Sequence, residues 1–78
     1  MSLASILFGG ILMLGQNLNR VRKTKGFTAQ HMADVLNISL STYRKYESNS
    51  RLASILTLIK IADYLDVSLD FLTGRIEK

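Results

Sequence analysis

The same helix-start pattern occurs twice between residues 27 and 47, and this repetition is the strongest constraint on how the chain folds. Thr28 can cap a first helix, because its hydroxyl can accept a hydrogen bond from an unpaired first-turn amide. Phe27 before the cap and Met32 inside the helix form a hydrophobic staple, an apolar pair that fixes the angle at which the chain enters the helix. Asn37 stands where a left-handed residue often ends a helix. We therefore expect the first helix to end just before Asn37.

The second occurrence begins at Ser39, which can cap another helix, with Ile38 and Tyr43 as its apolar pair. With about 100° of rotation per residue, Tyr43, Tyr46 and Glu47 fall on one side of this helix. The other side carries Ser41, Arg44, Lys45 and Ser48, with Leu40 at its margin. Two short helices joined by a tight turn, the second with an outward polar face, form the layout in which that helix enters a DNA major groove.

The flanking segments predict the rest of a small helical domain. We expect a helix from about Gly15 to Lys25, closed by Gly26, whose inward residues are Leu14, Leu18 and Val21. Residues 54–65 predict a core helix with apolar side chains at helical spacing, namely Ile55, Leu58, Ile61, Ala62 and Leu65. The predicted fold class is all-α, a compact five-helix domain with an apolar N-terminal extension.

The last of these helices repeats the cap pattern once more. Val67, Ser68 and Leu72 provide the cap and its apolar pair, and the helix should end by Thr73, with Gly74 as its stop. The last two helices carry more apolar residues than one small bundle needs, namely Ile59, Tyr64, Leu69 and Phe71. These side chains either face a partner or belong to an ordinary core.

Composition excludes several kinds of site. The 78 residues contain no cysteine, so neither a disulfide nor a thiolate metal site stabilises the domain. They also contain no proline. The single histidine, His31, cannot build a metal site alone, and we expect it to be a solvated side chain. The sequence also has no paired carboxylates at a spacing useful for catalysis and no glycine-rich phosphate loop. We therefore expect no enzyme activity, no metal and no cofactor.

Charge is distributed unevenly along the chain. Residues 20–51 carry seven basic and two acidic side chains, whereas residues 52–78 carry three basic and four acidic ones. The basic half therefore contains the repeated pattern, which favours a polyanion as partner. Contacts to phosphates would make binding fall steeply with salt, by about 0.9 log units per phosphate for each log unit of salt. The alternative is a basic surface that only contacts solvent.

Residues 1–12, MSLASILFGGIL, are apolar, but they are too short to span a bilayer and lack the positive start of a signal peptide. We expect a cytoplasmic protein with no membrane role, whose domain covers residues 13–78. Residues 1–12 would then be an extension, from an added leader or an upstream start. We expect a short helix there that breaks or kinks near Gly9 and Gly10 and packs on a second copy of the chain.

From Leu14 to Gly74 the chain resembles the Cro/repressor-type helix-turn-helix regulators of phages and bacteria, also called the XRE family. Three runs carry the resemblance: NLNRVRKTKGFT, LNISLSTYRKYE and LTLIKIADYLDVSLDFLTG. The resemblance implies a Cro-like, repressor-like fold and a prokaryotic regulator that binds double-stranded DNA. It also implies a homodimer on a palindromic operator, acting as a repressor by occupancy. Control would come from the protein level, a partner or antagonist protein, or loss of the dimer.

The same resemblance assigns roles to individual residues. It implies an ion pair between Arg22 and Glu47 that orients the second helix of the motif. Residues expected at base edges are Leu40, Ser41, Arg44 and Lys45, where arginine and lysine match guanine acceptors and leucine matches a thymine methyl. Residues expected at phosphates are Lys23, Thr28, Gln30, Ser39, Thr42, Ser48 and Asn49.

Some of these roles have simpler alternatives. Capping alone accounts for Thr28 and Ser39, and Leu40 is equally well read as an exposed leucine at a helix start. The family often has a glutamine where this chain has Ala29, with Gln30 one position later. A different class of function also stays open, namely an antitoxin or similar protein-interaction module in which DNA binding is secondary.

Overall fold

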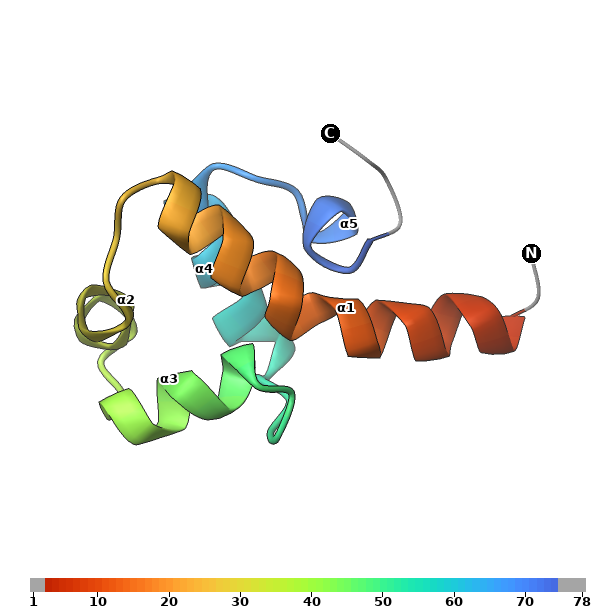
Figure 1. Ribbon diagram of the computed structural model, residues 1–78, viewed down its shortest axis with the longest axis horizontal. Helices are drawn as coiled ribbons and strands as arrows, with labels where there is room; N and C mark the ends of the chain where they lie inside the picture. The colour runs from red at the N-terminus through yellow and green to blue at the C-terminus, as the bar shows by residue number, and fades with distance from the viewer. Residues whose placement is uncertain (1–2, 75–78) are drawn as a thin grey trace.

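The computed structural model describes residues 3–74, with side chains from Met13 onward, and this part of the chain contains helices and no strands (Figure 1). The helices are α1 (Leu3–Thr24), α2 (Ala29–Leu36), α3 (Leu40–Glu47), α4 (Ile55–Leu65) and α5 (Leu69–Leu72). The predicted all-α fold class is therefore confirmed. Within residues 3–74, no helix combines the length and the apolar character needed to cross a membrane.

The repeated cap pattern produces α2 and α3 as expected. The Thr28 hydroxyl accepts a hydrogen bond from the His31 amide at 3.0 Å, and the Ser39 hydroxyl accepts one from the Thr42 amide at 3.1 Å. Asn37 takes the left-handed conformation, with φ 56° and ψ 46°. This turn brings the chain out of α2 and directly into the cap of α3, so local sequence determines where α2 ends and where α3 begins.

The same device begins α4 and α5, whose caps are Ser54 and Ser68. The predicted end of α5 is confirmed, since Thr73 caps its C-terminus and Gly74 follows with φ 79°. α4 ends at Leu65, as the predicted range 54–65 requires, but the residue that stops it was not predicted. There Asp66 takes a left-handed conformation with φ 57°, which aspartate tolerates better than most residues.

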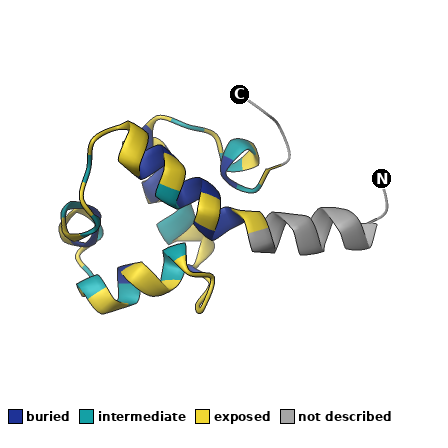
Figure 2. Ribbon diagram, viewed as in Figure 1, coloured by how far each residue is buried: buried dark blue, intermediate teal, exposed yellow. Residues whose placement is uncertain are grey.

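The C-terminal part of α1 provides one wall of the core, and the other helices pack around it (Figure 2). The inward residues expected on α1 are buried, and so are Met32 and Ala33 of α2 and Tyr43 of α3, whereas Leu36, expected on the same stripe of α2, is partly buried. The buried cluster consists of Leu14, Leu18, Val21, Met32, Ala33, Tyr43, Ile61, Ala62, Leu65 and Leu72. All five helices contribute at least one member, so the tertiary position of α3 depends on its neighbours.

Two expectations about α1 are wrong. It begins at Leu3 instead of near Gly15, and it continues through Gly9 and Gly10 as one helix without a break. Each glycine costs a helix only about 1 kcal/mol relative to alanine, and good helix formers, Leu7 and Leu12, stand on either side of the pair. Figure 1 shows the N-terminal part of α1 extending beyond the other helices. Contact of residues 1–12 with a second copy stays a prediction, since it involves side chains outside the described set.

The inward set expected on α4 also needs one correction. Ile61, Ala62 and Leu65 are buried and Leu58 is partly buried, but Ile55 is 62% exposed. Its position at the first residue of α4 places it beyond the end of the core cluster. The surplus apolar residues divide in a similar way. Leu69 and Phe71 pack against the core, as an ordinary core requires, whereas Ile59 and Tyr64 remain largely exposed.

Two leucines on α4 test this core. Leu65 is 1% exposed and Leu56 is 71% exposed. We expect Leu65→Ala to lower the free energy of unfolding by about 2–5 kcal/mol, because it leaves a cavity. The matched change Leu56→Ala should alter it by less than about 0.5 kcal/mol. Urea unfolding followed by circular dichroism measures both, and equal losses would contradict the burial described for α4.

Candidate nucleic-acid interface

Helix α3 buries one side and exposes the other. Tyr43 is 0% exposed and belongs to the core cluster, and Tyr46 packs against that cluster from the same side. The opposite side carries the exposed residues Ser41, Arg44, Lys45 and Ser48, while Leu40 is partly buried at the margin. The structure therefore brings the expected base-edge residues together on one exposed face, and their contact with bases stays a prediction.

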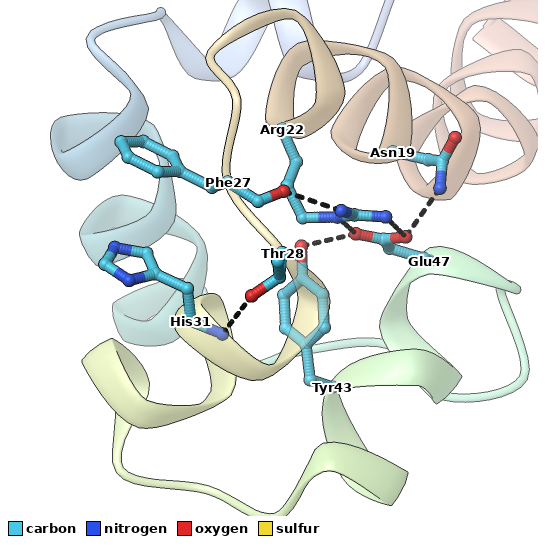
Figure 3. A network of polar contacts seen from close by, with 7 residues as sticks. All are labelled: Asn19, Arg22, Phe27, Thr28, His31, Tyr43 and Glu47. Carbon is cyan, nitrogen blue, oxygen red and sulfur yellow. Dashed lines mark hydrogen bonds and ion pairs between the residues drawn. The ribbon is translucent and has the colours of Figure 1, made fainter.

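Arg22 of α1 and Glu47 at the end of α3 form a two-pronged ion pair (Figure 3). The Arg22 Nε atom lies 2.6 Å from Glu47 Oε2, and Nη2 lies 3.2 Å from Oε1. Only 11% of each side chain is exposed. A charge-assisted pair with two parallel bonds fixes direction as well as distance, so the pair holds the end of α3 against α1.

Three further groups complete this network, and sequence reasoning missed all of them. Asn19 donates its amide to Glu47 Oε1 at 2.7 Å, and the Tyr43 hydroxyl donates to Oε2 at 2.5 Å. Arg22 Nη1 donates to the Phe27 carbonyl at 2.8 Å, which ties the chain entering α2 to the same group. Helical spacing offered a signal, because Asn19 precedes Arg22 by one turn and Tyr43 precedes Glu47 by one turn.

The network shifts the pKa values of its ionisable side chains. Burial alone would raise the pKa of Glu47, but hydrogen bonds from Arg22, Tyr43 and Asn19, together with the Arg22 charge, hold that pKa below its ordinary value. The hydrogen bond to Glu47 raises the pKa of Arg22 in spite of burial. Burial, and then the Glu47 carboxylate, raise the pKa of Tyr43. The carboxylate therefore stays ionised and the phenol stays protonated around neutral pH.

Most of the expected phosphate-contacting residues lie on the surface. Those exposed are Lys23, Thr28, Gln30, Ser39, Ser48 and Asn49, and Thr42 is partly buried. Several already have partners within the protein. Gln30 donates to the Asp34 carboxylate at 2.8 Å, and the Ser39 hydroxyl donates to Thr42 Oγ1 at 2.9 Å. Asn49 accepts a hydrogen bond from the Gly15 amide through Oδ1 at 3.0 Å.

His31 is partly exposed, as expected for a solvated side chain, but it also has a structural role. Its ring stacks on Phe27 with centroids 4.7 Å apart and planes 17° apart. Its Nε2 atom forms a hydrogen bond with the Tyr64 hydroxyl at 2.6 Å. The histidine therefore connects α2 to α4, a contact that helical spacing within one segment could not reveal.

Comparison with known proteins decides what kind of module this is. Residues 18–72 match the helix-turn-helix family model HTH_3. The chain belongs to this XRE-type family of transcription regulators of phage or bacterial origin. Members of the family bind double-stranded DNA and are regulators, not enzymes.

Individual relatives agree with this assignment. The chain is 48% identical over 60 residues to the uncharacterized HTH-type transcriptional regulator YqaE of Bacillus subtilis, covering 77% of this chain and 52% of that protein. It is 42% identical over 64 residues to the cryptic phage CTXphi transcriptional repressor RstR of Vibrio cholerae, covering 82% and 57%. A crystal structure of a transcriptional regulator from Listeria innocua superposes with a TM-score of 0.74 at 31% identity, covering 83% of this chain and 61% of that one. The chain thus spans about half the length of the curated relatives it matches.

The lowered pKa of Glu47 predicts how stability responds to acid. A carboxyl whose pKa is lower in the folded state stabilises the fold above its unfolded pKa, and this contribution is lost as pH falls through the folded pKa. The stability difference between the wild type and Glu47→Gln should therefore be largest near neutral pH and shrink below the ordinary carboxyl pKa of 4.5.

Urea midpoints measured between pH 7 and pH 3 test this expectation. Asp63→Asn, which neutralises an exposed carboxyl on α4, is the matched control and should parallel the wild type throughout. A difference between the wild type and Glu47→Gln that stays constant down to pH 3 would contradict the role given to the ionised carboxylate.

Proposed function

We propose that this chain binds double-stranded DNA with sequence specificity, as a dimeric transcription regulator that represses by occupying its operator. The observation that carries the proposal is the division of α3 into two sides. On its inner side Glu47 bonds to Arg22 of α1 and is braced by the Tyr43 hydroxyl of the same helix. Its outer side exposes Arg44 and Lys45 next to small polar residues. A rigidly held helix with an exposed basic face suits insertion into a major groove.

Within this face we assign base reading to the residues that point outward together. Arg44 and Lys45 suit the N7 and O6 acceptors of guanine, and Ser41 suits several base edges. Leu40 lies at the margin of the face, half buried, and suits a thymine methyl group. These assignments rest on the exposure and the chemistry of the side chains.

Phosphate contacts would come from the rim of the motif. The exposed residues at the start of α2, Thr28 and Gln30, and at the start of α3, Ser39, lie beside helix N-termini, where amides and the helix dipole favour anions. Thr42 and Ser48 on α3 and Lys23 on α1 are the other candidates. Such contacts position the protein on DNA without reading its sequence.

A dimer follows from the size of the recognition surface. One short helix reads few base pairs, whereas two copies would place two α3 helices about 34 Å apart, one turn of DNA, on a palindromic site. The relative from Vibrio cholerae is named as a repressor, which supports repression for this chain as well. Occupancy of an operator would then exclude polymerase without any ligand or cofactor.

One observation favours a second candidate, a protein-interaction module such as an antitoxin. Ile55, Leu56 and Ile59 are exposed and lie at the spacing of one face of α4, and Leu52 in the segment before this helix is exposed as well. A contiguous exposed apolar stripe is typical of a protein interface. A partner that co-purifies stoichiometrically from the native cell and requires Leu56 would favour this candidate.

Selection of binding sites from a random duplex pool tests the proposal. We expect both the full chain and a chain beginning at Met13 to enrich a palindromic sequence. Salt-dependent binding to any duplex, with no enriched sequence from either protein, would contradict sequence-specific regulation and favour the partner-dependent candidate.

Substitutions on α3 test which residues read bases. We expect Arg44→Ala and Lys45→Ala each to weaken operator binding by about 1–3 kcal/mol and to relax preference at one operator position. Lys23→Ala should weaken all duplexes about equally and reduce the salt slope by about 1. Lys60→Ala on α4 removes the same charge outside the motif and serves as the control. Unchanged preference in both α3 variants would refute the assigned face.

A further inference from the structure

Gly15 of α1 contacts Asn49, in the turn just after α3. This contact is separate from the Arg22–Glu47 ion pair, and the family resemblance gives it no role. We propose that Gly15 and Asn49 are positioning residues that set the angle at which α3 is presented to DNA. The inference rests on the proposed function, since it concerns the orientation of the exposed side of α3, which carries Ser41, Arg44 and Lys45. It also replaces the expected phosphate role of Asn49 with a structural one.

The first observation is how closely α1 and the end of α3 approach each other at Gly15. A Cβ atom added to Gly15 would lie 2.4 Å from the Glu47 carbonyl oxygen and 2.6 Å from Asn49 Oδ1. The nearer of these atoms belongs to the backbone and cannot rotate away. Glycine is therefore needed at this position if the two helices are to keep their present distance.

The second observation is the geometry of Asn49. Its backbone has φ 62°, a left-handed conformation that asparagine tolerates better than most residues. In this conformation its Oδ1 atom accepts a hydrogen bond from the Gly15 amide at 3.0 Å. The turn that ends α3 is thus bonded back to α1 through a side chain, and Asn49 has a role that does not require DNA.

The two contacts together explain why this arrangement fixes an angle. Glu47 attaches α3 to α1 at Asn19 and Arg22, and Asn49 attaches the following turn at Gly15. Gly15 and Arg22 are seven residues apart, which is about 10 Å along a helix. One attachment point would let α3 pivot about Glu47, whereas two separated points oppose that rotation.

The positioning role and the phosphate role predict different results in binding. Loss of a phosphate contact weakens all duplexes alike and reduces the salt slope by about 0.9. Loss of positioning leaves the phosphate count unchanged but lowers the ratio of operator affinity to random-duplex affinity, because base contacts require α3 at the correct angle. Both quantities come from one series of titrations over several salt concentrations.

Two variants of Asn49 separate these roles, because glycine and aspartate both accept a left-handed backbone. Asn49→Gly removes the acceptor, and we expect it to lower the affinity ratio about tenfold, as loss of one base contact does, with the salt slope unchanged. Asn49→Asp retains an acceptor oxygen and should keep the ratio within about twofold of the wild type, even though its charge weakens binding overall. An equal loss for all duplexes with a reduced slope in Asn49→Gly would overturn the inference.

Gly15→Ala provides an independent test, because Gly15 is buried and cannot touch DNA itself. The added methyl should push the end of α3 away from α1 and lower the affinity ratio without changing the salt slope. Gln16→Ala, at the exposed neighbouring position, is the control and should match the wild type. A Gly15→Ala protein that is folded and keeps the wild-type ratio would also overturn the inference.

A measurement without DNA keeps this inference separate from the proposed function. Residual dipolar couplings of backbone amides report the angle between α1 and α3 directly. We expect a changed angle in Asn49→Gly and Gly15→Ala, and the wild-type angle in Asn49→Asp and Gln16→Ala. Identical angles in all four variants would refute positioning whether or not the chain binds DNA. A wild-type chain that selects no DNA sequence would refute only the proposed function.

Discussion

The arrangement of this domain depends on the Glu47 carboxylate, a nearly buried charge at the end of α3. Removing such a charge from water costs several kcal/mol unless partners compensate it. Arg22, Asn19 and Tyr43 supply those partners, and two of them come from α1. A pair of this kind contributes little net stability compared with apolar packing, so its value lies in orientation. It holds the end of α3 against α1, and the Asn49–Gly15 contact opposes rotation about that point.

The side chains that cap the N-termini of the helices are the second determinant of this arrangement. Thr28, Ser39, Ser54 and Ser68 each accept a hydrogen bond from an amide in the first turn of the helix that follows. Short helices of this kind are marginal by themselves, so a cap worth about 1 kcal/mol matters to each. Capping fixes where each helix begins, and the core and the Glu47 network then fix how the helices are oriented. Capping and tertiary packing together determine where the exposed side of α3 with Ser41, Arg44 and Lys45 lies.

Local rules predicted most of this fold and only part of the site. The bounds of α2, α3 and α5 followed from caps and left-handed stops, which involve residues close together in the chain. The start of α1 was missed because two glycines weaken a helix without ending it. The Asn19, Tyr43 and Asn49 contacts were missed for different reasons. Asn49 and Asn19 meet partners 34 and 28 residues away, and such pairings depend on tertiary structure. Tyr43 lay within reach of helical spacing, but its ring was read only as core.

The proposed function requires α3 to enter the major groove in a fixed orientation. Dimethyl sulfate protection on a selected operator measures this, because the reagent methylates guanine N7 in the major groove and adenine N3 in the minor groove. We expect protection of guanine N7 in two major-groove segments about one helical turn apart on the same face of the duplex. Protection confined to adenine N3, or no protected position on a bound operator, would contradict it.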